Sequence, residues 1–188
     1  MKKAYQFLAT GFEEVEALCP LDILRRGGVE VVNVSITGQL LVEGAHGVFV
    51  QADTLFEEAD FGDADLLMLP GGMPGATNLN SHEPLRQLLL GHHARGGLVA
   101  AICAAPLVLG GLGLLEGRRA TCYPGFQQTL LGADYTADLF VVDGNVITGE
   151  GPAAAFPYGY ALLSMLVDEP TAFGVAEGMR YNHLMQSR

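Results

Sequence analysis

The chain has 188 residues, of which 49% are hydrophobic and 16% charged, so it can bury a large core and is not intrinsically disordered. Its formal net charge of -11 would repel phosphate backbones and anionic lipid, so we expect no nucleic-acid partner and no membrane partner. No linker-like stretch or charge run divides the sequence, and we expect one domain over residues 1–188.

Apolar runs typical of buried strands alternate with helix-length segments along the chain. We predict strands over residues 4–9, 29–36, 65–69, 97–102, 139–142 and 146–148, with a short antiparallel excursion at 40–52 and a hairpin turn at Asp143 and Gly144. We predict helices near residues 13–26, 82–95, 104–112, 153–166 and 171–179. This alternation predicts an α/β fold with a mainly parallel β-sheet and helices on both of its faces.

Residues 96–115 contain no charged side chain and are long enough to cross a bilayer. The glycines and Pro106 within this segment disfavour a single helix, and Arg95 and Arg118 beyond its two ends give no orientation bias. We therefore predict a buried strand followed by a buried helix.

The N-terminus and the cysteines point to an intracellular protein. The first apolar stretch is interrupted by Gln6 and runs into acidic residues, so we expect no signal peptide. Cys19, Cys103 and Cys122 fit neither a disulfide framework nor the ligand spacing of a structural zinc site, and we expect no metal. A reducing cytoplasm, where a free thiol is available, fits these features best.

Three loops follow the carboxyl ends of predicted strands, where the catalytic residues of open parallel sheets gather. They are residues 10–16, residues 70–75 and the turn at Cys103. At a strand-to-helix junction, backbone amides and the helix dipole would favour a thiolate and lower the pKa of the Cys103 thiol. An inert buried cysteine is the alternative in so apolar a stretch, and we expect the other two thiols to be inert.

Glu16 shares a helical strip with Cys19 and Ile23, so its side chain should face inward. A buried carboxyl near a thiolate would have a raised pKa and could carry a proton, whereas the plain alternative is a polar residue at a helix edge. Glu13 and Glu14, in the first turn, are expected to be solvated and to complement the helix dipole.

Gly71 and Gly72 follow a predicted strand but lack the lysine and the spacing of a P-loop. Two interpretations remain open for them, a plain glycine turn and a pair of exposed amides in an oxyanion pocket. The histidines offer no evident catalytic base: His92 and His93 fall near a predicted helix end, and His46 is isolated in sequence.

Several motifs together resemble those of one family. The segments GFEEVEAL, LPGGMPGATNL, AAICAAP, TCYP and TGEGPAAAF are similar to the ThiJ/PfpI superfamily, specifically to the branch of the parkinsonism-associated protein deglycase and its small bacterial relatives. The resemblance covers nearly the whole chain. It implies a flavodoxin-like sandwich, usually a homodimer, with Cys103 as an oxidation-sensitive nucleophile and Glu16 as its protonated partner.

The resemblance also implies a pocket around the cysteine. The backbone amides of Gly72 and Ala104 would form its oxyanion site, and Gly71 and Tyr123 would line it. Ala104 stands where the protease and large chaperone branches have a histidine, which disfavours peptidase activity. Tyr123 and Glu150 stand where the deglycase branch often has histidine and arginine, so this pocket would be less cationic.

Two functions follow from the resemblance. The first is a cofactor-free enzyme of oxidative or carbonyl stress, glyoxalase III-like or deglycase-like, in which Cys103 attacks a small dicarbonyl or an early glycation adduct and Glu16 moves the proton. The second is a non-enzymatic redox sensor or stress chaperone, in which Cys103 oxidises to a sulfinate. The sequence does not separate them, and it shows no thiazole or phosphate site that would indicate thiamine metabolism.

Overall fold

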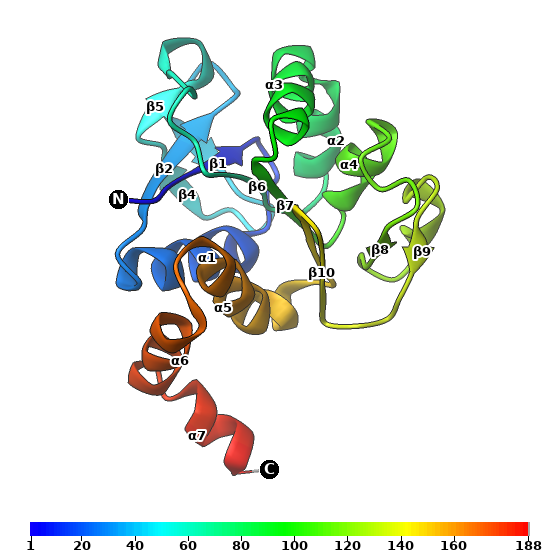
Figure 1. Cartoon of the computed structure of the whole chain (residues 1–188). Coiled ribbons are helices and arrows are strands. Elements are labelled where there is room, and N and C mark those ends of the chain that lie inside the picture. Colours follow the sequence, from blue (N-terminus) through cyan, green and yellow to red (C-terminus); the bar gives the residue numbers. More distant parts are fainter. Residues whose placement is uncertain (188) are drawn as a thin grey trace.

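The computed structural model describes residues 1–187, and a seven-stranded β-sheet lies at the centre of these residues (Figure 1). The strand order is β10-β11-β7-β6-β1-β2-β5, and neighbouring strands pair in parallel except β10, which is antiparallel to β11. The strands are β1 (Lys3–Leu8), β2 (Glu30–Ser35), β5 (Thr54–Leu55), β6 (Leu66–Leu69), β7 (Leu98–Ile102), β10 (Phe140–Asp143) and β11 (Val146–Gly149).

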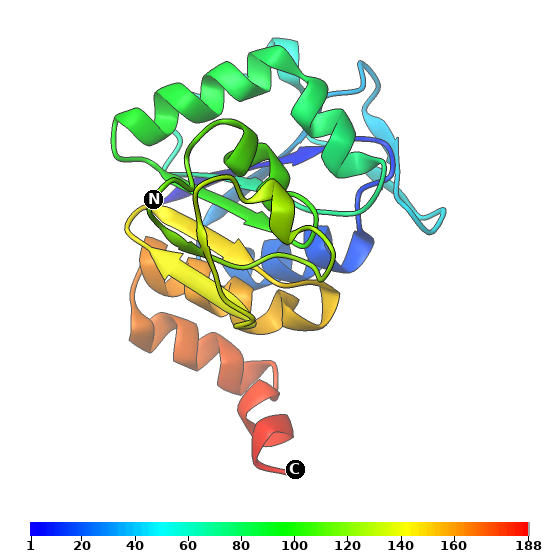
Figure 2. The ribbon, with the colours of Figure 1, turned by 90° about the vertical axis from the view of Figure 1, so that its right-hand side faces the viewer.

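Helices cover both faces of this sheet (Figures 1 and 2). Helices α1 and α5 pack against each other on one face, α2, α3 and α4 lie on the other, and α6 and α7 extend from α5 away from the sheet. The helices are α1 (Glu14–Arg26), α2 (Gly75–Ser81), α3 (Glu83–Ala94), α4 (Pro106–Gly111), α5 (Ala155–Leu166), α6 (Glu169–Gly178) and α7 (Tyr181–Gln186).

Smaller elements connect these layers. Strand β3 (Leu41–Glu43) pairs antiparallel with β4 (Phe49–Gln51), and β8 (Arg119–Ala120) pairs in parallel with β9 (Asp134–Tyr135). Short 3-10 turns lie at Phe56–Glu58, Gln127–Thr129 and Pro152–Ala154.

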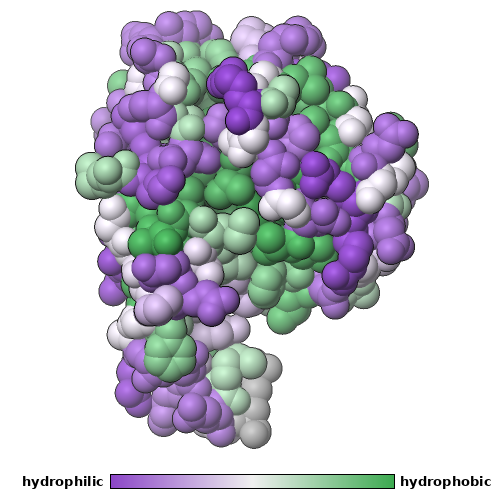
Figure 3. Space-filling view, in the orientation of Figure 1, coloured by the Kyte–Doolittle hydropathy of each residue, from purple (hydrophilic) through white to green (hydrophobic). Residues whose placement is uncertain are grey.

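The central strands are apolar on both faces because helices bury both sides of the sheet. Every residue of β6 is buried, as are the last four residues of β7. Some hydrophobic side chains remain exposed, among them Val15, Leu18 and Phe156 on α1 and α5. Hydrophobic surface interrupts the hydrophilic surface across the middle of the face shown in Figure 3.

This architecture confirms the predicted flavodoxin-like α/β fold with a mainly parallel sheet. The apolar segment 96–115 forms β7, α4 and the turns around them, and no helix within residues 1–187 has the length and apolar character to cross a bilayer. Helix α2 was not predicted, because Gly75, Thr77 and Asn78 have poor helix propensity. The paired strands β8 and β9 were missed because two residues carry no periodicity.

Candidate active site

Cys103 immediately follows β7, at the carboxyl ends of the neighbouring parallel strands β1, β6 and β7. Its backbone lies in the left-handed region, with φ 65°. Its amide donates to the carbonyl of Gly149 over 2.9 Å, and its carbonyl accepts from the amide of Tyr123 over 2.9 Å. Helix α4 begins at Pro106, so the thiol stands on the predicted sharp turn between strand and helix.

Helix α1 follows β1 and places Glu16 at the same carboxyl ends of the strands. The residue is 1% exposed, which agrees with the inward position predicted from the helical strip. Its Oε2 accepts a hydrogen bond from the amide of Gly71 over 2.9 Å. A Cβ atom on Gly71 would lie 2.7 Å from this oxygen and 2.7 Å from the Cβ of Cys103, so the carboxyl group and the cysteine flank the same glycine.

Burial shifts the acidity of both groups in this pair. Desolvation raises the pKa of Glu16 to about 7, against the opposing effects of Cys103 and the Gly71 amide. Desolvation, together with the Glu16 carboxyl, raises the pKa of Cys103 to about 12, while the amides of Gly72 and Ala104 act in the opposite direction. The prediction of a lowered thiol pKa is therefore wrong, because desolvation outweighs the amides at this buried turn.

Cys103 and Glu16 consequently titrate as a pair that loses one proton near neutrality and the second far above it. When the remaining proton is on sulfur, the negative charge lies on the Glu16 carboxylate, which accepts a hydrogen bond from the amide of Gly71. With that proton on Glu16, the charge lies on a sulfur that faces the amides of Gly72 and Ala104. The second arrangement is the nucleophilic one, and these amides favour it.

Tyr158 of α5 is a neighbour that sequence reasoning missed. Its hydroxyl is buried and, within residues 1–187, has no hydrogen-bond partner; the same holds for Oε1 of Glu16. Burial, and next the charge of Glu16, raise the pKa of Tyr158. An aromatic residue in an apolar helix gave no signal beyond core packing, so only the folded arrangement identifies this hydroxyl as a neighbour of the carboxyl group.

A cavity of about 250 Å³ lies against the segments that hold the Cys103 backbone. It is lined by Tyr123, Pro124, Glu150 and residues 151–154. Tyr123 is 47% exposed and contributes to the wall of this cavity. Gly71, also expected in the wall, is buried with its amide directed at Glu16.

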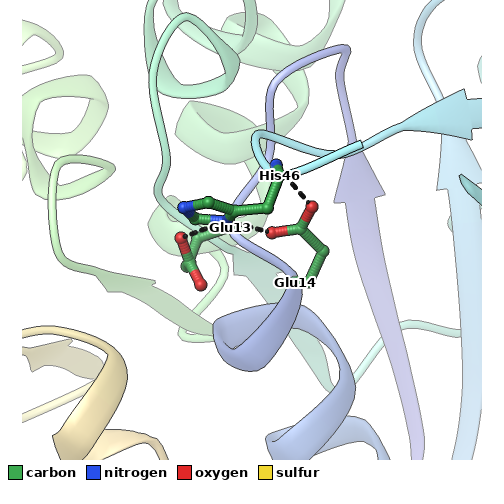
Figure 4. A group of neighbouring side chains, drawn as sticks. All are labelled: Glu13, Glu14 and His46. Atoms are coloured by element: carbon green, nitrogen blue, oxygen red, sulfur yellow. Dashed lines mark hydrogen bonds and ion pairs between the residues drawn. The ribbon is translucent and has the colours of Figure 1, made fainter. Parts of the chain in front are cut away.

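The first turn of α1 is fastened to the loop between β3 and β4 by His46 (Figure 4). The imidazole Nδ1 lies 2.7 Å from Oε2 of Glu14 and 3.5 Å from Oε2 of Glu13, and the His46 amide donates to Oε1 of Glu14 over 2.7 Å. Glu14 is buried, so the prediction that it is solvated is wrong. His46 is paired, which its sequence position, 32 residues from Glu14, could not indicate.

This cluster contains the two carboxyl groups that lie three and two residues before Glu16. Burial would raise the pKa of Glu14, yet the hydrogen bonds from His46 lower it overall, and Glu14 in turn raises the pKa of His46. The donor atoms of Glu13, Glu14 and His46 lie within 4.8 Å of one another, so within residues 1–187 this is a group that could share a metal ion. The imidazole already bridges the two carboxylates without one.

The other two thiols differ from Cys103 in their surroundings rather than in their acidity. Burial raises the pKa of Cys19 to about 12 and that of Cys122 to about 11. Cys103 shares the high value, but it alone of the three has a titrating carboxyl group and two backbone amides acting on its sulfur.

Comparison with known proteins gives consistent matches. The DJ-1/PfpI family pattern matches residues 2–165. Protein DJ-1 homolog B of Arabidopsis thaliana is 38% identical over 177 residues, covering 93% of this chain but only 40% of that protein. A deglycase of Pyrococcus abyssi is 34% identical over 161 residues, covering 84% of this chain and 95% of the relative. A DJ-1 superfamily protein of Salmonella typhimurium, solved as a cysteine-to-alanine mutant, is 34% identical with a TM-score of 0.91, covering 95% of this chain and 98% of that one.

Proposed function

Because the chain belongs to the DJ-1/PfpI family, we propose that it is a cysteine-dependent, cofactor-free enzyme that acts on small reactive dicarbonyls or on early glycation adducts. The observation that carries the proposal is the pairing of Cys103 with a buried, titrating Glu16 across Gly71. The similarity to a protein named as a deglycase supports the same class of chemistry. A role in oxidative or carbonyl stress follows from these substrates.

The thiolate of Cys103 begins the reaction by adding to the aldehyde carbon of a dicarbonyl such as methylglyoxal. The carbonyl π pair moves to oxygen, and the amides of Gly72 and Ala104 stabilise the resulting oxyanion. Protonation of this oxygen by Glu16 completes a hemithioacetal.

Glu16 then moves a second proton. Its carboxylate removes the proton from the former aldehyde carbon, which gives an enediolate, and then returns a proton to the neighbouring carbon. The hydroxyl proton of the first carbon passes to the oxygen of the second, so the first carbon becomes the carbonyl carbon of a thioester. A pKa of about 7 suits this exchange, because the group is then present in both protonation states near neutral pH. Water hydrolyses the thioester to a 2-hydroxy acid and restores the Cys103 thiol. With a glycation adduct, the C–N bond breaks as the C–S bond forms, and Glu16 protonates the leaving amine.

Turnover of methylglyoxal, without glutathione or added metal, tests the proposal most directly. The wild-type chain and a Cys122→Ala variant should form lactate, whereas Cys103→Ala should not. Labelling with a small alkylating agent, followed by peptide mapping, should find Cys103 modified before Cys19. Equal lactate formation by wild type and Cys103→Ala would refute the role of the cysteine.

The same geometry favours a second candidate, a non-enzymatic redox sensor or stress chaperone. A sulfinate on Cys103 would be held by the amides of Gly72 and Ala104 and by a protonated Glu16. Mild peroxide should then add two oxygen atoms to Cys103 before Cys122, as read by mass spectrometry. Sulfinate formation without methylglyoxal turnover would favour this second candidate over the enzyme.

A further inference from the structure

Glu150 is a charged residue beside the site that the proposed reaction does not use. It directly follows Gly149, whose carbonyl accepts a hydrogen bond from the amide of Cys103. Tyr123 holds the other side of the cysteine by donating its amide to the Cys103 carbonyl. Glu150 and Tyr123 both line the cavity of about 250 Å³, so the cavity is built on the two segments that hold the Cys103 backbone.

The rest of the cavity lining is apolar or aromatic. Pro124, Pro152 and small residues form most of its wall beside the exposed ring of Tyr123. Gly151 keeps the cavity open next to this ring, since a Cβ there would lie 3.1 Å from Cδ2 of Tyr123. Within residues 1–187 no ion pair involves Glu150, so its carboxylate is the uncompensated charge of this wall.

An uncompensated carboxylate beside an aromatic ring and apolar walls suits an alkylammonium or guanidinium group, which both the charge and the ring attract. The same carboxylate repels a carboxylate or sulfonate. We infer that this cavity is a cation-selective subsite, in which Glu150 favours carbonyl compounds joined to a cationic group over anionic 2-oxo acids. The carbonyl chemistry rests on the proposed function, whereas the charge selection requires only a thiol that can be reached.

Two thiol reagents of similar size and opposite charge test the selection without any turnover. The trimethylammonioethyl and sulfonatoethyl methanethiosulfonates each transfer a thioalkyl group to a thiolate and release methanesulfinate, forming a mixed disulfide. Rates at Cys103, read by peptide mapping and divided by the rates for a free thiol, give a cation-to-anion ratio. We expect a ratio above one that Glu150→Gln lowers by about fivefold, the size of a single charge acting through partly screened space.

Glu58→Gln is the matched control, because it removes the same charge from an exposed residue beside β5, at the opposite edge of the sheet. This variant should leave the ratio within about twofold of wild type, as expected for a charge beyond the screening length. High salt should bring the wild-type ratio toward one. An unchanged ratio in Glu150→Gln refutes the subsite, and so does a Cys103 that reacts with neither reagent.

Substrates provide the second arm. Glu150→Gln should lower kcat/KM for the arginine adduct of methylglyoxal by about fivefold and leave kcat/KM for uncharged methylglyoxal nearly unchanged. If neither compound is turned over, the proposed function fails, while the reagent ratio still decides the charge selection. Equal losses for both compounds would show that Glu150 acts on the reaction and not on substrate charge, which contradicts the inference.

Discussion

Replacing Glu16 by glutamine should change how the stability of the fold depends on pH. Burial raises the pKa of Glu16 from its ordinary 4.5 to about 7, so the folded state prefers the protonated carboxyl group. The stability that this group contributes is complete below pH 4.5 and is lost as the pH rises through 7. At about 1.4 kcal/mol per pKa unit, the total loss is about 3 kcal/mol, most of it between pH 5 and pH 8.

Urea unfolding from pH 5 to pH 8 measures this dependence. Glutamine keeps the shape of the side chain and an acceptor for the Gly71 amide, but it does not titrate. The free energy of unfolding of wild type, minus that of Glu16→Gln, should therefore fall by about 2.5 kcal/mol across this range. Glu58→Gln, an exposed control, should give a flat difference. A flat difference for Glu16→Gln as well would show that the carboxyl group titrates near its ordinary pKa, and the shared-proton mechanism would fail.

Two further predictions concern the glycine between the pair and the oligomeric state. Gly71→Ala places a methyl group 2.7 Å from both the carboxylate oxygen and the cysteine Cβ, so it should cost about 1–3 kcal/mol in urea unfolding. Gly174 lies on α6, and a Cβ built there would meet no other part of the fold within 4 Å, so Gly174→Ala should stabilise by about 0.5–1 kcal/mol. Equal effects of the two substitutions would contradict this packing. Val15, Leu18 and Phe156 are exposed apolar side chains that a second copy of the chain could cover, so light scattering should give about twice the 19.9 kDa chain mass. Leu18→Glu should shift this mass toward that of the monomer. A monomeric wild type at micromolar concentration would contradict the expected homodimer.

The fold was readable from the sequence wherever burial imposed a pattern. The continuous apolar runs of β6 and β7 identify central strands of a parallel sheet, and the strip through Glu16 correctly predicts which side of α1 faces inward. Helix α2 was not readable, because tertiary packing and not propensity holds its glycine, threonine and asparagines in a helix.

The site was less predictable, because its electrostatics depend on distances between segments far apart in the chain. His46 reaches Glu14 across a loop, so a pair of residues that looks solvated in sequence contains one buried carboxylate. A lowered pKa of Cys103 is expected from the backbone amides and the helix alone, but desolvation raises this pKa by more than the amides lower it. Likewise, the Tyr158 hydroxyl becomes relevant only once α5 packs against α1.

The left-handed backbone at Cys103 lowers the stability of the fold at the same position that supplies the reactive thiol. A side chain held at φ 65° costs on the order of 1–2 kcal/mol relative to glycine. In a laboratory evolution experiment that rewards only heat resistance, glycine should therefore displace cysteine at this turn. In one that rewards survival of carbonyl stress, cysteine should persist. The ratio of glycine to cysteine at position 103 thus indicates which of the two selections has acted on a population of variants.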